Sequence, residues 1–185
     1  MRYDYIIWDF NGTLLDDVQL CFDLLNKMLS KRNIPTVSME RYKEIFRFPV
    51  SEYYKLAGFD FDKEPFAVTA VEFIEDYQPM SLECSLYNGT KEVLETLNAL
   101  GIKQLILSAS EINNLKEQTK HFGLNEYMID ILGTDTIHAI SKKEIAKNWI
   151  KERHLDPKRI LFIGDTNHDF EVANYIGVDC VLIAN

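Results

Sequence analysis

Short apolar runs alternate with amphipathic stretches along most of the chain. Apolar runs bounded by glycine and polar residues are typical of strands buried in a parallel sheet. We expect strands at 3–9, 102–108, 159–164 and 179–184, and a weaker one at 128–133. Patterns with helical spacing lie between and beside them, at 90–100, 110–122, 142–154 and 167–176. This alternation predicts an α/β fold, a doubly wound and mostly parallel sheet with helices on both faces.

Local signals set the ends of these predicted helices. Ser141 and Glu144 form a capping-box pair at the start of 142–154, and Gly177 is placed to end 167–176. Ser110 is interpreted as the cap of the helix that follows it.

The stretch 17–86 follows a different pattern. Val18, Cys21, Leu25 and Met28 recur at helical spacing, and no convincing strand appears. We expect helices at 17–31, 39–46, 52–57 and 65–78. The prediction is an all-helical cap at 17–86, inserted into a core formed by 1–16 and 87–185, with most Tyr and Phe residues of the insertion in its interior.

Composition narrows the class of protein. A net charge of −9 argues against partners that require a basic face, such as nucleic acid or a membrane surface. The three cysteines, Cys21, Cys84 and Cys180, have no paired spacing, which favours a reducing interior over a disulfide framework. The N-terminus lacks the pattern of a signal peptide. We therefore expect a cytoplasmic protein; the sequence gives no indication of its oligomeric state.

Two carboxylates follow predicted strands, Asp9 after the first and Asp165 after 159–164. Ligands of open parallel sheets gather outside the carboxyl ends of the strands, so we expect these two acids to meet in one pocket. Mg²⁺ prefers oxygen ligands and usually takes one or two carboxylates together with substrate phosphate. The pair therefore predicts a magnesium and phosphate site, with Asp169 in or near it.

Four segments, in order, resemble the haloacid dehalogenase-like hydrolase superfamily, in particular its helical-cap, phosphoglycolate phosphatase-like branch. Asp9-Phe10-Asn11-Gly12-Thr13 is similar to the family's strand-plus-DxDGT motif, and Ser108 to its Ser or Thr that ends a strand. Lys142 or Lys143 matches its lysine at a helix start, and Gly164-Asp165 with Asp169 matches GDxxxD. The resemblance covers essentially the whole chain and implies a Rossmann-like core.

The resemblance implies a role for each matching position. Asp9 is expected to attack phosphorus and form an aspartyl-phosphate, aided by Ser108 and the lysine. The implied magnesium ligands are Asp9, the backbone carbonyl of Asn11, Asp165 and Asp169. Further contacts to a small phosphorylated metabolite are expected from Gly12, Thr13, Ala109, Arg47 and Lys143.

Several of these positions have a second interpretation. Asp169 is also placed to cap a helix with Thr166, and both roles can hold. We prefer Lys142 to Lys143 as the site lysine. Arg47 suits a substrate carboxylate or second phosphate as well as it suits an exposed salt bridge.

Asn11 departs from the family pattern, which has an aspartate there for proton transfer. An amide has no proton to exchange near neutral pH. We therefore expect slower turnover, with the smallest loss of rate for aryl and acyl phosphates. Asp16 or Asp17 could supply a substitute proton, although a solvated helix cap is the preferred role for Asp17. The alternatives are a phosphate-binding or regulatory domain with little turnover, and a hydrolase of carbon–phosphorus or carbon–halogen bonds.

Overall fold

The computed structural model of the protein describes residues 2–134 and 141–184. The chain divides into two compact units: a core unit, residues 1–16 with 85–185, and a helical unit, residues 17–84. Each unit is described by itself.

The core unit contains a five-stranded parallel sheet in the order β5-β4-β1-β6-β7. Its strands are β1 (Tyr5–Trp8), β4 (Lys103–Glu111), β5 (Met128–Thr134), β6 (Ile160–Gly164) and β7 (Asp179–Leu182). All five predicted strands are present, and the predicted α/β fold class is confirmed. The central strands β1, β4 and β6 carry continuous apolar runs because both of their faces are covered.

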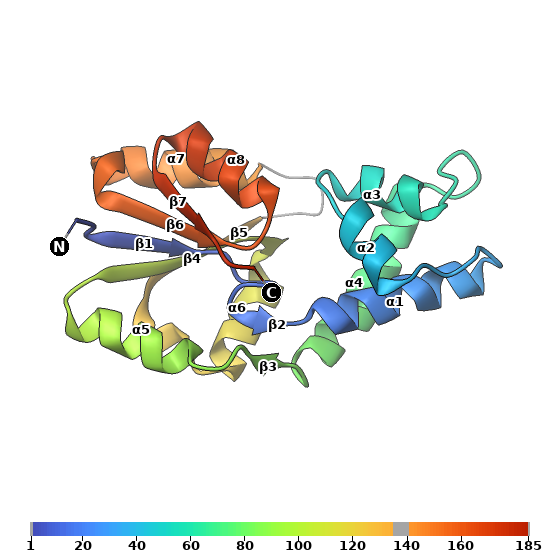
Figure 1. Ribbon diagram of the computed structural model, residues 1–185, viewed down its shortest axis with the longest axis horizontal. Helices are drawn as coiled ribbons and strands as arrows, with labels where there is room; N and C mark the ends of the chain where they lie inside the picture. The colour runs from blue at the N-terminus through green and yellow to red at the C-terminus, as the bar shows by residue number, and fades with distance from the viewer. Residues whose placement is uncertain (1, 135–140, 185) are drawn as a thin grey trace. The chain divides into compact units, whose positions relative to one another are not determined.

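Helices cover both faces of this sheet, with α7 and α8 on one side and α5 and α6 on the other (Figure 1). Their bounds are α5 (Thr90–Ala99), α6 (Ile112–His121), α7 (Lys142–Glu152) and α8 (Asn167–Ile176), with short 3-10 turns at Asn125–Tyr127 and Pro157–Arg159. Apolar side chains of α7 and α8 pack on those of the central strands, among them Trp149, Val172, Ile7 and Phe162. This packing holds in place the carboxyl ends of β1 and β6, which Asp9 and Asp165 directly follow.

A small antiparallel pair, β2 (Leu15–Asp16) with β3 (Ser85–Leu86), also belongs to the core unit. The sequence predicts that 85 and 86 belong to the helical insertion, with no strand there, whereas the structure places them in β3 of the core unit. Two-residue strands are too short to produce a periodic pattern, so their pairing is visible only in three dimensions.

The helical unit contains α1 (Val18–Lys31), α2 (Met39–Ile45), α3 (Val50–Ala57) and α4 (Phe66–Ser81). The predicted helices are present. However, α4 continues past the expected end at 78, with Pro79 in its last turns. Most of the unit's core is aromatic or aliphatic, including Tyr42, Tyr53, Tyr54 and Phe59, as expected from the sequence.

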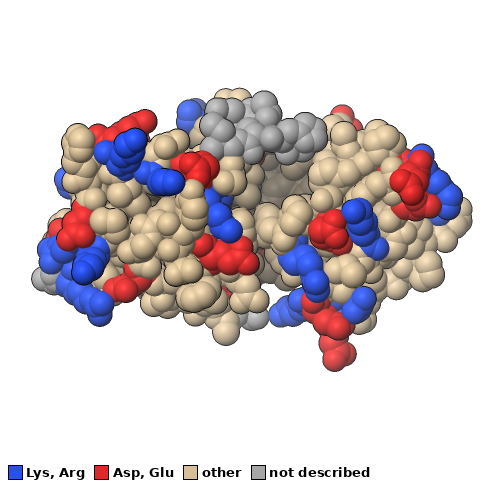
Figure 2. Space-filling view, turned by 90° about the horizontal axis from the view of Figure 1, so that it is seen from above, with Lys and Arg blue, Asp and Glu red and all other residues tan. Residues whose placement is uncertain are grey.

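Acidic and basic side chains are interspersed on the face of the protein that Figure 2 shows. This mixture differs from the continuous basic stripe of a nucleic-acid-binding face. Among the described helices, none is long and apolar enough to cross a membrane.

Candidate active site

Asp9 and Asp165 lie side by side because they follow neighbouring parallel strands. Trp8 of β1 pairs with Ile163 of β6, and the Asp9 N–H donates to the Ile163 carbonyl at 2.8 Å. Asp165 comes directly after Gly164, the last residue of β6. The geometry places both carboxylates at the carboxyl edge of the sheet, as the sequence predicts.

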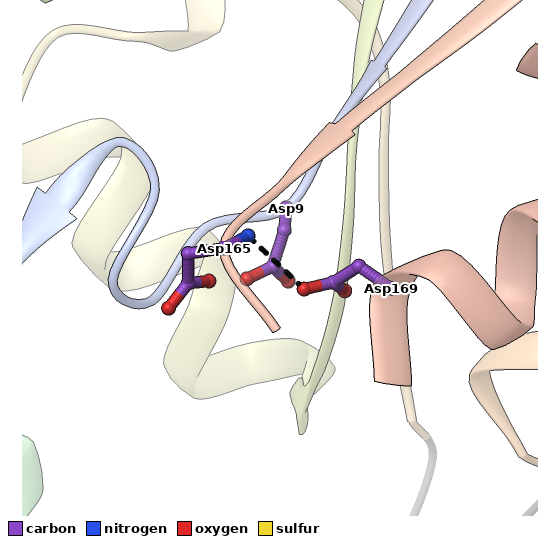
Figure 3. Close-up of side chains that lie close together, drawn as sticks. All are labelled: Asp9, Asp165 and Asp169. Carbon is purple, nitrogen blue, oxygen red and sulfur yellow. Dashed lines mark hydrogen bonds between the residues drawn. The ribbon is translucent and has the colours of Figure 1, made fainter. Parts of the chain in front are cut away.

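Asp169 joins them from the first turn of α8. One carboxylate oxygen from each of Asp9, Asp165 and Asp169 lies within 4.8 Å of the others, and the three side chains lie close together in Figure 3. Asp169 also accepts from the Thr166 N–H at 3.0 Å and forms a capping box with that residue. The capping role is confirmed, and the metal role stays a prediction that this geometry supports.

Lys142 is the lysine that lies among these carboxylates. Its Nζ donates to Asp9 Oδ1 at 2.5 Å and to Asp169 Oδ1 at 2.6 Å, and the residue is buried. Lys143 instead donates to Glu171 at 3.0 Å, an ion pair between α7 and α8. The structure therefore brings the preferred lysine to the site and places the other in a different contact.

The cluster carries more negative than positive charge. Burial raises the pKa of Asp9 to about 7; Lys142 opposes the shift, and Asp169 and Asp165 add to it. Burial and the charge of Asp169 raise the pKa of Asp165 to about 6. Burial lowers the pKa of Lys142, but Asp9 and Asp169 more than offset this and the net shift is upward.

The turn after β1 is shaped around Asp165. Gly12 has φ +74°, and a Cβ there would lie 2.4 Å from Asp165 Oδ2, so glycine is required for two reasons. Thr13 Oγ1 donates to Asp165 Oδ1 at 3.0 Å. Thr13, predicted to contact substrate, therefore holds a carboxylate of the cluster in this structure.

Hydroxyl groups from β4 surround Asn11. Ser108 Oγ lies 3.2 Å and Ser110 Oγ 3.0 Å from Asn11 Oδ1, and the two hydroxyl oxygens are 3.1 Å apart. Ala109 lies between them and is exposed, and its carbonyl accepts from Thr134 Oγ1 at 3.3 Å.

The prediction that Ser110 caps a helix is wrong. The strand β4 continues to Glu111, whose carboxylate accepts from the N–H groups of Asn113 and Asn114 and so caps α6. Ser110 was missed as a site residue, although its spacing of two from Ser108 could have indicated that both side chains share a face of an extended strand.

Two residues of the helical unit for which the sequence predicts a role contact other residues of the same unit. Arg47 donates to the backbone carbonyls of Ile45 and Glu44, at the end of α2. Asp17 is buried, makes no side-chain cap bond and accepts from the Tyr77 hydroxyl at 2.5 Å. Asp17 is the N-cap residue of α1 as expected, but the expectation that its carboxylate is solvated is wrong, because a side chain of α4 engages it.

The carboxylate cluster has the ligand chemistry of a hard divalent cation. Its donor atoms are all oxygens, and one lysine does not neutralise three acids that lie within reach of one ion. The raised pKa values of Asp9 and Asp165 express the same excess of negative charge. Asp9, Asp165 and Asp169 thus fit a divalent cation that prefers oxygen ligands.

Comparisons with known proteins agree with this description. A sequence model of the family described as haloacid dehalogenase-like hydrolase matches residues 6–183. A phosphoglycolate phosphatase from Vibrio vulnificus is 29% identical over 111 residues, which are 58% of this chain and 49% of that protein. The tyrosine-protein kinase PtkA of Mycobacterium tuberculosis is 22% identical over 180 residues, 96% of this chain and 61% of that protein. The chain thus matches about half to three fifths of the length of these relatives.

The fold also matches a solved structure. A haloacid dehalogenase-like family hydrolase from Streptococcus pneumoniae superposes with a TM-score of 0.85 at 17% identity, covering 99% of this chain and 85% of that chain. At this identity the match shows a shared fold.

Proposed function

The chain belongs to the haloacid dehalogenase-like hydrolase family, and on that premise we propose that it is a magnesium-dependent phosphatase of a small phosphorylated metabolite. The observation that carries the proposal is the meeting of Asp9, Asp165, Asp169 and Lys142 at one edge of the sheet. The name of the Vibrio vulnificus relative supports phosphoester chemistry. The three free cysteines among the described residues support a reducing, cytoplasmic location.

Asp9 is the proposed nucleophile. One oxygen of its carboxylate attacks phosphorus, the bond from phosphorus to the leaving oxygen breaks, and an aspartyl-phosphate forms. Lys142 holds the Asp9 carboxylate by its Oδ1 atom and offsets charge beside the transferred group. A magnesium ion held by the carboxylates of Asp9, Asp165 and Asp169 and by the backbone carbonyl of Asn11 would offset the charge of the phosphoryl oxygens.

Ser108 is proposed to donate a hydrogen bond to a phosphoryl oxygen. Its hydroxyl lies at the carboxyl end of β4, beside the turn that carries Asn11. The exposed residue Ala109 and the turn at Gly12 are the proposed further contacts of the phosphoryl group. The helical unit is proposed to act as the cap that selects the substrate, with the segment 46–49 as its selectivity loop.

Asn11 limits the leaving groups that the site accepts. A carboxylic acid at this position could protonate a departing alkoxide, whereas an amide cannot. General acid–base catalysis contributes about 10²–10⁴-fold, so its absence slows the reaction without abolishing it. Acyl and aryl phosphates are the favoured substrates, because their leaving oxygens depart without a proton.

The test is hydrolysis of acetyl phosphate, p-nitrophenyl phosphate and phosphoglycolate by the purified chain, with magnesium or with EDTA. We expect magnesium-dependent release of phosphate, fastest from acetyl phosphate, and loss of it in Asp9→Asn. Asn11→Asp should raise the rate most for phosphoglycolate. Asn148→Asp, which adds the same charge to an exposed position of α7, is the matched control.

A domain that binds phosphate but turns over little is the second candidate, and Asn11 is the observation that favours it. The same assay separates the two. If neither the parent chain nor Asn11→Asp releases phosphate, while magnesium and inorganic phosphate still bind, the phosphatase proposal is wrong and the binding domain stands.

A further inference from the structure

Residue 11 is held in place by two hydroxyl groups, and this arrangement bears on how the site handles protons. Asn11 Oδ1 lies 3.2 Å from Ser108 Oγ and 3.0 Å from Ser110 Oγ. The Ser110 N–H donates to Ser108 Oγ at 3.1 Å, so the proton of that hydroxyl is left to donate toward Asn11 or Ser110. The Ser110 hydroxyl donates to Asn11 Oδ1. The amide oxygen is thus the acceptor at the end of this network.

None of the three side chains in this network accepts a proton near neutral pH, since two are hydroxyls and one is an amide. The nearby carboxylates are engaged elsewhere. Glu111 caps α6, Asp165 accepts from Thr13, and Asp169 accepts from Lys142 and its own helix cap. Among the described residues, the side chains that these contacts place at residue 11 offer hydrogen bonds, and neither hydroxyl is a base.

The two halves of the proposed reaction differ in their need for a base. When the donor is an acyl phosphate, Asp9 attacks phosphorus, the bond from phosphorus to the acyl oxygen breaks, and its electron pair leaves with the donor as a carboxylate. No proton moves. In the second half, water attacks the aspartyl-phosphate, the electron pair of the phosphorus–oxygen bond returns to Asp9, and the water must give up a proton.

We propose that acyl phosphates phosphorylate Asp9, and that the chain then retains the phosphoryl group as a long-lived phosphoenzyme. The reason is that the amide of Asn11, held by two hydroxyls, cannot serve as the base for hydrolysis of the aspartyl-phosphate. This inference rests on the proposed function, since it needs Asp9 as the nucleophile. It assigns the chain a further activity, storage of a phosphoryl group drawn from a small carboxylic–phosphoric anhydride. Release of that group is the slow step.

The experiment mixes the purified full chain with acetyl phosphate and magnesium, quenches with acid at intervals, and measures intact mass. We expect most of the parent chain to carry one phosphoryl group that hydroxylamine removes, and no such species in Asp9→Asn. After excess donor is removed, the group should be lost about 10²–10⁴-fold faster from Asn11→Asp than from the parent. Asn148→Asp should behave like the parent chain.

A Ser110→Ala variant tests whether the network itself passes a proton. We expect the loss rate to change by less than about tenfold, because the hydroxyl anchors the amide and does not carry a proton. A loss rate more than about tenfold slower would make Ser110 part of a proton path of the size expected for general base catalysis, and would overturn the inference.

Two other results separate this inference from the function on which it rests. Steady release of phosphate by the parent chain, without any accumulated phosphoenzyme, would overturn the storage role and leave the phosphatase proposal standing. If neither the parent chain nor Asn11→Asp gains a phosphoryl group or releases phosphate, the proposed function itself is wrong.

Discussion

Replacing Asp9 with asparagine should stabilise the metal-free protein and weaken its binding of magnesium relative to the parent chain. The reason is the buried charge of the cluster, where one lysine faces three acids. The pKa of Asp9 lies at about 7 in the fold against 3.8 ordinarily, mainly because of burial. This difference corresponds to about 4 kcal/mol in favour of the neutral side chain. Asparagine is neutral and similar in shape, so Asp9→Asn removes this penalty.

The sign of the pH dependence follows from the raised pKa. Well below pH 3.8, the ordinary pKa of an aspartate, the parent chain holds Asp9 protonated in both states, and the variant has no advantage. As the pH rises to about 7, the unfolded chain ionises while the folded chain keeps its proton, so the free energy of unfolding of the parent falls. Above pH 7 the advantage of Asp9→Asn stays constant. At about 2–4 °C per kcal/mol, the melting temperature should rise by roughly 10 °C.

The assay is thermal unfolding of the parent chain and Asp9→Asn in EDTA from pH 5 to 8, repeated with magnesium. Saturating magnesium at about 100 times its dissociation constant should stabilise the parent by about 2.7 kcal/mol and the variant by less. Asp62→Asn, at an exposed aspartate outside the cluster, should change stability by less than about 0.5 kcal/mol. If Asp9→Asn melts below the parent chain in EDTA at pH 8, the argument from buried like charges is refuted.

Three further changes test the site's construction. Lys142→Met should destabilise the protein by about 3–5 kcal/mol in urea unfolding, because it leaves two buried carboxylates without their cation; an unchanged midpoint would contradict this. Gly12→Ala should weaken magnesium binding in calorimetry, because its Cβ would lie 2.4 Å from Asp165 Oδ2. The control is Gly89→Ala, which has a similar φ and no neighbour within 4 Å and should leave the magnesium affinity unchanged. Thr166→Ala removes the cap of α8 and should cost about 0.5–2 kcal/mol; a smaller loss would show that the cap is dispensable.

Much of the core unit and its acidic pair could be predicted from the sequence. The apolar runs that become β1 and β6 each end directly before an acid, and parallel strands bring such ends to one edge. The bounds of α8 also match the prediction, because Thr166 and Gly177 are strong start and stop signals. Local chemistry and strand direction were sufficient for these features.

Other features depend on contacts between distant residues. Lys142 and Lys143 are adjacent and chemically identical, and only the packing of α7 on the sheet decides which one reaches Asp9. The Tyr77 hydroxyl that engages Asp17 lies on another helix. Ser110 looked like a helix cap because a serine before a helical pattern usually is one, whereas Glu111 takes that position.

The pairing of β1 with β6 has a consequence for the order in which the protein matures during synthesis. The ribosome makes the strand before Asp9 well ahead of that strand's neighbour in the sheet, Ile160–Gly164. Until then the nascent chain lacks Asp165 and Asp169, although the segment 17–84, which forms a compact unit in the folded protein, has already been synthesised. An ion site built from Asp9, Asp165 and Asp169 is thus complete only after both strands have been synthesised and have paired.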